Sequence, residues 1–116
     1  MQKISIAIHG GAGTILKEDM TPELEKEYRA GLQQALDAGF AVLENGGTAV
    51  TAVKAAVIHL EDNDLFNAGA GAVFTKKGVH ELDAAIMNGL TLDAGAVAGV
   101  RNIRNPVELA EEVMSY

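Results

Sequence analysis

The chain has 116 residues, a formal net charge of −7, 48% apolar residues and only 4% aromatic residues. This length fits one domain, and the acidic balance argues against a nucleic-acid partner, because phosphate binding needs a basic surface. The absence of cysteine excludes disulfides, thiolate nucleophiles and zinc–thiolate sites.

Membrane insertion and secretion are not expected from this sequence. No apolar run approaches the roughly 18 residues of a membrane span. The first residues lack the basic and apolar regions of a signal peptide and lead directly into an alternating segment. We therefore expect a soluble, cytoplasmic protein with no membrane partner.

The first half of the chain predicts one strand and two helices. Lys3 to His9 alternates, is β-branched and ends at Gly10-Gly11, which predicts a strand that runs into a loop. Thr21-Pro22 predicts the N-cap and first residue of a long helix that ends at Gly46-Gly47. Its expected apolar face is Leu24, Tyr28, Leu32, Ala35, Leu36, Phe40 and Leu43.

A second helix is expected to start after an N-cap at Thr48. It is apolar over most of its circumference, which favours a position between two layers. Three short strands should follow, at Ala72 to Thr75, His80 to Met87 and Ala94 to Val100. Asn105 and Glu108 resemble a capping box for a last helix. This order of elements predicts an α+β fold with an antiparallel sheet.

The stretch Leu65 to Thr75, LFNAGAGAVFT, places one Asn amide inside a glycine-rich bend. Held there, the NH₂ of Asn67 could donate to a developing negative charge, as an oxyanion-hole donor does. Gly69 and Gly71 would allow close approach of a substrate or another backbone. The alternative is an ordinary turn residue whose side chain bonds its own backbone.

Three separated motifs carry a family resemblance. IAIHGGAG at residues 6–13, LFNAGAGAVFT at residues 65–75 and HELDAAIMNG at residues 80–89 occur in the order typical of plant-type L-asparaginases and isoaspartyl peptidases. TLDAGAVAGV at residues 91–100 extends the match. The chain therefore resembles this family of N-terminal-nucleophile hydrolases over nearly its whole length.

The resemblance implies a larger, self-cleaving amidohydrolase. Such a precursor cuts itself into an α and a β subunit and frees an N-terminal Thr, whose hydroxyl is the nucleophile and whose α-amine is the base. Residues 1–116 would be the N-terminal portion of the α subunit, a single incomplete domain without the nucleophile and inactive alone. It would supply one helix layer and part of a sheet to a four-layer αββα sandwich, in a dimer of αβ units.

The whole enzyme would hydrolyse β-aspartyl dipeptides and L-asparagine, both small-molecule substrates. By the same resemblance, Asn67 donates to the oxyanion, and His9, Gly10 and Gly11 form a loop beside the active site that is linked to self-cleavage. For His9, a hydrogen-bonded histidine at a strand end is the alternative.

No organic cofactor is implied, but a structural sodium ion is. Oxygen ligands suit a hard cation, and a helix C-terminus presents free carbonyls. The alternative is a hydrogen-bonded loop without an ion. The implied ligands are the backbone carbonyls of Leu60, Glu61, Asn63, Phe66, Ala68 and Ala70.

Several other polar residues are expected to be structural. Thr14 and Thr48 each follow a glycine, but Thr14 does not lead into the small apolar strand expected after the cleavage site, and Thr48 is explained as the N-cap of a helix. His80 and Glu81 should point to opposite faces of a strand, which spoils joint metal ligation. Glu81 and Asp83 should fasten the sheet to loops. Asn88 stands where the family often has Asp, which puts a charge-based role there in doubt.

Three alternatives stay open at this point. The first is a truncated, non-catalytic assembly or binding module of the same fold. The second is a nucleotide-binding glycine loop at residues 10–13, although neither G-x-G-x-x-G nor a P-loop is present. The third is the glycosylasparaginase branch, which the motifs fit less well.

Overall fold

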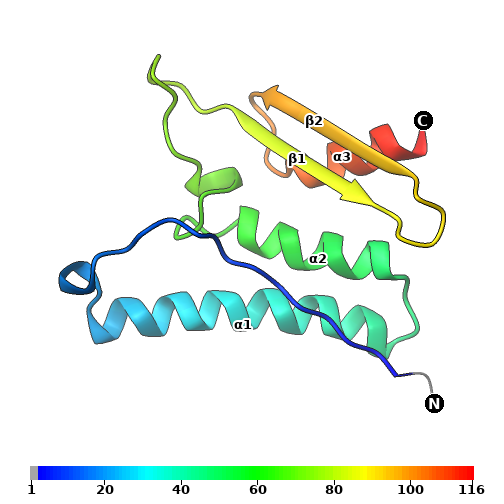
Figure 1. The fold of residues 1–116 in the computed structure, drawn as a ribbon, viewed down its shortest axis with the longest axis horizontal. Coiled ribbons are helices and arrows are strands. Elements are labelled where there is room, and N and C mark those ends of the chain that lie inside the picture. The colour runs from blue at the N-terminus through cyan, green and yellow to red at the C-terminus, as the bar shows by residue number, and fades with distance from the viewer. Residues whose placement is uncertain (1–2) are drawn as a thin grey trace.

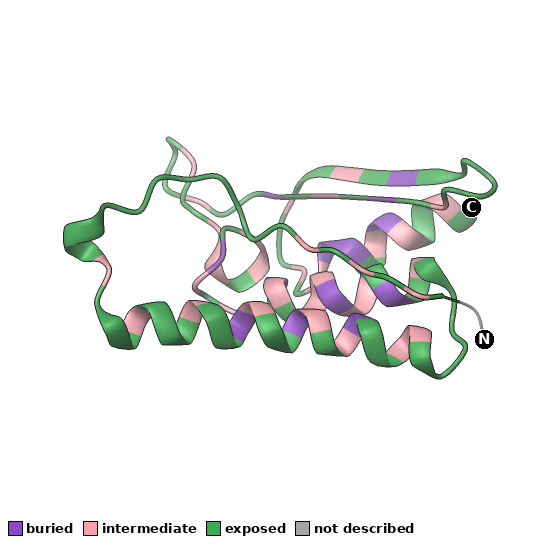
Figure 2. Ribbon diagram, turned by 60° about the horizontal axis from the view of Figure 1, so that its bottom comes forward, coloured by how far each residue is buried: buried purple, intermediate pink, exposed green. Residues whose placement is uncertain are grey.

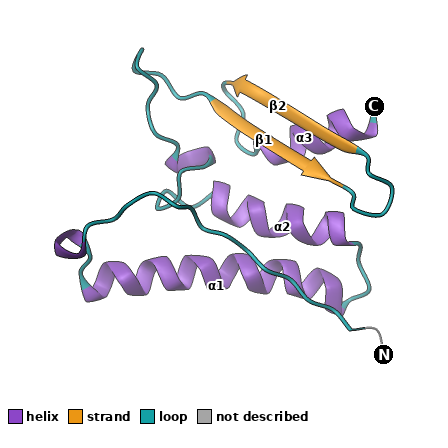
Figure 3. Cartoon of the chain, in the orientation of Figure 1, coloured by secondary structure: helices purple, strands orange, loops and turns teal. Residues whose placement is uncertain are grey.

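The computed structural model describes residues 3–116, which form three α-helices and one two-stranded antiparallel sheet (Figure 3). The α+β fold class predicted from the sequence is therefore confirmed. Among these residues, no helix is both long and apolar enough to cross a membrane. The elements are α1 (Pro22–Glu44), α2 (Ala49–Glu61), β1 (Leu82–Met87), β2 (Ala94–Val100) and α3 (Pro106–Ser115), with 3₁₀ turns at Lys17–Asp19 and Gly69–Gly71.

The starts of the first two helices match the predictions from sequence. The Thr21 hydroxyl accepts the Leu24 N–H at 3.0 Å, which satisfies one of the free donors in the first turn of α1. Thr48 caps α2 in the same way, through the N–H of Thr51 at 3.1 Å. After α1, Gly46 has φ +80°, a conformation that glycine adopts without a steric penalty.

Helices α1 and α2 pack through small residues. Gly31, Ala35 and Gly39 are the buried positions of α1, and Ala52 and Ala56 face them from α2. A Cβ added at Gly39 would lie 2.9 Å from the Ala52 carbonyl oxygen. The predicted apolar face is largely confirmed, because Ala35 is buried and Leu24, Tyr28, Leu32, Leu36 and Leu43 are half-buried, but the two buried glycines beside it were not predicted. Phe40, which was expected to be in the core, is 37% exposed.

The β1–β2 hairpin and α3 enclose the main apolar cluster. Strand pairing runs from Leu82 opposite Val100 to Met87 opposite Ala94, with an irregularity between Leu82 and Ala84. Helix α3 packs on one face of the hairpin, and Ile86, Val107 and Ala110 form the buried centre.

Helix α2 lies between α1 on one side and the hairpin with α3 on the other (Figure 1). Val50, Val57 and Ile58 of α2 pack against the Ile86 cluster. The predicted position of α2 between two layers is thus confirmed.

Two predicted strands are wrong. Lys3–His9 is extended but has no strand partner within residues 3–116. It crosses α1 and α2, and Ile4, Ile6 and Ile8 are half-buried while the residues between them are exposed (Figure 2). The alternation was therefore read correctly, but a strand also needs a hydrogen-bonded neighbour.

The segment Ala72–Thr75 is irregular as well, because its backbone is used in turns. The Val73 N–H bonds a side chain, and the Thr75 N–H donates to the Val79 carbonyl at 2.8 Å. The strand predicted from His80 begins only at Leu82.

Candidate active site

The side chain of Asn67 is held across the glycine-rich bend by its oxygen. Its Oδ1 accepts the Val73 N–H at 3.0 Å, a bond that spans six residues. Because the amide oxygen is occupied, the orientation of the amide is fixed and the NH₂ points away from Val73. Asn67 is exposed, and its NH₂ makes no hydrogen bond to another residue in the range 3–116. This is the geometry of an available donor.

Asn67 and part of the glycine loop line one surface cavity of about 460 Å³. Gly10 and Gly11 border it on one side, and Leu65, Phe66 and Asn67 border it on another. These positions lie far apart in the sequence, and the structure brings them together at one cavity. The rest of the lining comes from Gly13, Thr14, Ile15, Met20, Tyr28 and Leu32.

His9 does not line that cavity. Its ring accepts the Gly11 N–H through Nδ1 at 3.1 Å, so any proton on the neutral ring is at Nε2. His9 instead borders a separate apolar cavity of about 170 Å³, beside Ile8 and against Val53, Ala56, Val57 and Leu60 of α2. Within the loop, the structure therefore places Gly10 and Gly11 beside Asn67, and places His9 where it shapes the turn.

The backbone carbonyls named for sodium surround a tight glycine turn. An added Cβ at Gly69 would collide with the Glu61 carbonyl oxygen, and one at Gly71 would collide with that of Phe66. The carbonyls of Leu60, Asn63, Phe66 and Ala68 each also accept a backbone N–H, at 2.8 to 3.3 Å. Glu61 and Ala70 accept none among the residues described.

The donor chemistry of this loop suits a monovalent cation. Neutral carbonyl oxygens are hard ligands, and those of Glu61 and Ala70 accept no backbone N–H among the residues described. Within residues 3–116 no group of three or more His, Cys, Asp or Glu side chains could hold a metal ion. A metal in this part of the chain would therefore depend on main-chain oxygens.

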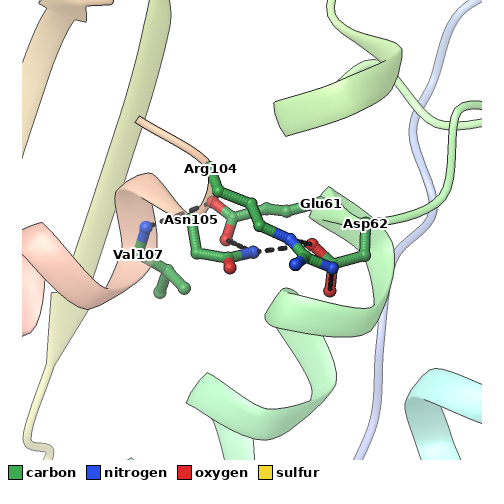
Figure 4. Close-up of polar contacts among 5 residues, drawn as sticks. All are labelled: Glu61, Asp62, Arg104, Asn105 and Val107. Atoms are coloured by element: carbon green, nitrogen blue, oxygen red, sulfur yellow. Dashed lines mark hydrogen bonds and ion pairs between the residues drawn. The ribbon is translucent and has the colours of Figure 1, made fainter. Parts of the chain in front are cut away.

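A polar clamp joins the end of α2 to the start of α3 (Figure 4). It consists of Glu61, Asp62, Arg104, Asn105 and Val107. The Glu61 carboxylate, only 2% exposed, accepts the Val107 N–H at 3.1 Å and the Asn105 amide at 3.3 Å. The Asp62 carboxylate accepts a hydrogen bond from the same Asn105 amide at 3.0 Å. It also accepts two from the Arg104 guanidinium, from Nε at 3.1 Å and from Nη2 at 3.2 Å.

The pKa values of the two carboxylates of the clamp are shifted in opposite directions. Burial raises the pKa of Glu61, an effect that the hydrogen bond from Val107 and that from Asn105 oppose. The hydrogen bond from Asn105 lowers the pKa of Asp62, helped by Arg104. Glu61 belongs to both the clamp and the carbonyl loop. Its carboxylate is harder to keep charged than that of Asp62.

The predicted capping box at Asn105 is wrong. The Asn105 side chain makes no cap bond to α3, because its amide is directed to Glu61 and Asp62. The Glu61 carboxylate, from a different helix, supplies the missing acceptor for the first turn. A signal was present in the sequence: an acid at the C-terminal end of an apolar helix opposes the helix dipole, and so needs another partner.

The acidic residues of the hairpin have the expected fastening role. The Asp83 carboxylate accepts the Gly99 N–H at 2.8 Å, next to the pairing irregularity, and Glu81 forms an ion pair with Arg101 at 2.6 Å. Asn88 accepts the Leu90 N–H at 2.9 Å as a turn residue. These three side chains therefore serve the hairpin.

Comparison with known proteins identifies the family. The model of the asparaginase family matches residues 1–116. An isoaspartyl peptidase/L-asparaginase of Xenopus laevis is 52% identical over 94% of the chain, and an isoaspartyl peptidase of Escherichia coli strain K12 is 51% identical over 98%. A plant-type L-asparaginase of Pyrococcus furiosus is 50% identical over 96%. The chain belongs to the asparaginase family.

The match covers only part of each relative. The aligned region is 34% of the Xenopus protein, 36% of the Escherichia coli protein and 35% of the Pyrococcus protein. The chain thus spans about a third of the length of these relatives.

Proposed function

We propose that residues 1–116 form the N-terminal part of the α subunit of an amidohydrolase that cleaves β-aspartyl dipeptides and L-asparagine. Family membership and the activities named for three relatives at about 50% identity support this assignment. The single observation in this chain that carries it is the Asn67 amide, tied down through its oxygen and open at its NH₂.

The reaction proceeds through a Thr at the N-terminus of a β subunit, outside these residues. Its hydroxyl oxygen bonds to the substrate carbonyl carbon while its α-amine takes the proton, and negative charge develops on the carbonyl oxygen. The Asn67 NH₂ donates to that oxygen. The C–N bond then breaks, the amine leaves with the proton, and water hydrolyses the acyl-enzyme to release aspartate.

Sodium is the cation proposed for the carbonyl loop. The carbonyls of Leu60, Glu61, Asn63, Phe66, Ala68 and Ala70 would hold it, and the ion would stiffen the bend that carries Asn67. Support comes from the Glu61 and Ala70 carbonyls, which accept no backbone N–H among the residues described.

The proposed assembly is a four-layer αββα sandwich in a dimer of αβ units. Helices α1 and α2 form part of one helix layer, while the hairpin and Lys3–His9 form part of one sheet. Exposed apolar residues, including Phe74, Met87 and Leu90, support a further layer against this chain. The 116 residues alone are proposed to be inactive, and turnover of a β-aspartyl dipeptide by the pure isolated chain would contradict the Thr-in-β assignment.

The test of the proposed function is Asn67→Ala in the full-length protein. Loss of one oxyanion donor lowers kcat by about 100-fold to 1,000-fold, with an unchanged circular dichroism spectrum. Asn45→Ala, at the far end of α1, is the matched control and should keep full turnover. Near-parental turnover in Asn67→Ala would refute the assignment.

A further inference from the structure

Phe66 precedes Asn67, and its aromatic ring is buried among three separate parts of the chain. The side chain is 5% exposed. Its ring meets that of Tyr28 on α1 edge to face, with centroids 5.7 Å apart. The same ring lies against Gly31, also on α1, and against Gly10 in the glycine loop.

Two glycines create the space that the ring fills. A Cβ added at Gly31 would lie 3.0 Å from Phe66 Cε2, and one at Gly10 would lie 3.3 Å from Phe66 Cε1. Both distances are tighter than an ordinary carbon contact. Neither glycine has a positive φ, so the requirement at these two positions is for space and not for an unusual backbone angle.

The ring therefore joins the two halves of the candidate site. Its main chain continues directly into Asn67, and its edge touches the loop that contains Gly10. Both parts line the same cavity. A rigid aromatic side chain between them limits how far the Asn67 amide can move relative to the glycine loop.

We propose that Phe66 is a positioning residue, which sets the Asn67 amide at its working distance from the glycine loop through its side chain. The inference rests on the proposed function, because the distance matters only if the amide donates to the oxyanion. Its effect is expected in kcat more than in KM, since misplacement by about 1 Å can lower turnover by 100-fold.

The first experiment compares two core substitutions in full-length, processed enzyme, with turnover normalised to the cleaved fraction by intact mass. Phe66→Leu shortens the ring but keeps an apolar side chain. Ile86→Ala removes a buried side chain from the hairpin core, away from the cavity. Both should lower the melting temperature, and only Phe66→Leu should lower kcat, by about 10-fold to 100-fold with KM within about twofold.

A double-mutant cycle separates positioning from general packing. If Phe66 acts through the Asn67 amide, then Phe66→Leu in an Asn67→Ala background should lower kcat no further. Additive losses would overturn the inference, as would a Phe66→Leu enzyme with kcat within twofold of the parent. Tyr28→Leu, which removes the edge contact from α1, gives a second route if Phe66→Leu folds poorly, and it should lower kcat in the same direction.

The two possible failures are distinguishable. If Asn67→Ala is inactive but Phe66→Leu turns over normally, the positioning role fails and the proposed function stands. If Asn67→Ala keeps normal turnover, the oxyanion assignment fails, and the positioning role fails with it.

Discussion

The hairpin with α3 and the segment Lys3–Met20 satisfy their backbone and apolar groups in different ways. The hairpin pairs its own strands, covers one face with α3 and encloses Ile86, Val107 and Ala110. Lys3–His9 lies extended over α1 and α2 without a strand partner in the described chain. The hairpin and α3 therefore bury a core together with one side of α2, whereas the extended segment has no strand partner among the described residues.

The difference shows where stability and function are separated. The hairpin and α3 contain the Ile86 cluster, and the polar clamp fixes α3 to the end of α2. The candidate site lies where the glycine loop and the Asn67 bend meet. Loops placed on a rigid scaffold are the usual location of catalytic groups.

The largest effect is expected in the closed core. Ile86→Ala should lower the free energy of unfolding by about 3 kcal/mol, through lost apolar transfer and the cavity left behind. Val113→Ala, at a position on α3 that is 47% exposed, should lower it by less than about 1 kcal/mol. Urea unfolding of the full-length protein measures both, and equal losses would contradict the placement of the core.

Hydrogen exchange tests whether the extended segment Lys3–His9 has a strand partner in the full-length protein. In the full-length protein, the amides of Lys3–His9 should exchange about 100-fold more slowly than in an unstructured peptide, because the proposed sheet would supply their missing partners. Mass spectrometry after deuterium labelling gives the rates. Free exchange there, beside protected amides in β1, would argue against a shared sheet.

Breaking the polar clamp should have an intermediate effect. Glu61→Ala leaves the buried Val107 N–H without an acceptor, which costs about 2 kcal/mol of stability. Glu108→Ala is the control, because Glu108 lies in the same first turn but is exposed, and its favourable dipole term is only about 0.5 kcal/mol. Thermal unfolding of both variants measures the two losses of stability. Equal losses would mean that the negative charge near the start of α3, and not the hydrogen bond to Val107, is responsible.

The smallest effect is expected at a helix cap. Thr21→Ala removes the acceptor for the Leu24 N–H and should destabilise the protein by about 1 kcal/mol. Thr21→Ser keeps a hydroxyl and should retain most of that stability. A Ser variant as unstable as the Ala variant would mean that the threonine methyl group, and not the cap, is responsible.

The sequence predicted what local chemistry determines. Thr21 and Thr48 cap their helices because a hydroxyl bonds a backbone N–H only three residues away. The strand at Ala94–Val100 has its predicted bounds, since a short turn joins it to its partner strand Leu82–Met87. The Asn67 bend was also recognisable, and a bond from its side chain to nearby backbone was the alternative given there, but Val73 was not predicted as the partner.

The sequence did not predict contacts between distant segments. Asn105 has the form of a cap residue, but it bonds two carboxylates more than forty residues earlier in the chain. Two buried positions of α1 are glycines, because the α2 backbone comes close at Gly39 and the Asn63 and Phe66 side chains come close at Gly31, and hydrophobic periodicity gives glycine no weight. The position of the Phe66 ring depends on three segments at once, so no local pattern encodes it.

Glu61 connects two regions of the molecule through different atoms of one residue. Its carbonyl faces Gly69 in the bend, while its carboxylate bonds Asn105 and Val107 at the start of α3. Any residue at position 61 can present a backbone carbonyl to the bend. Only a residue with a side-chain acceptor can bond Asn105 and Val107. Positions 61 and 105 are therefore expected to co-vary among homologous sequences, and a mutant library aimed at this bend should randomise them together.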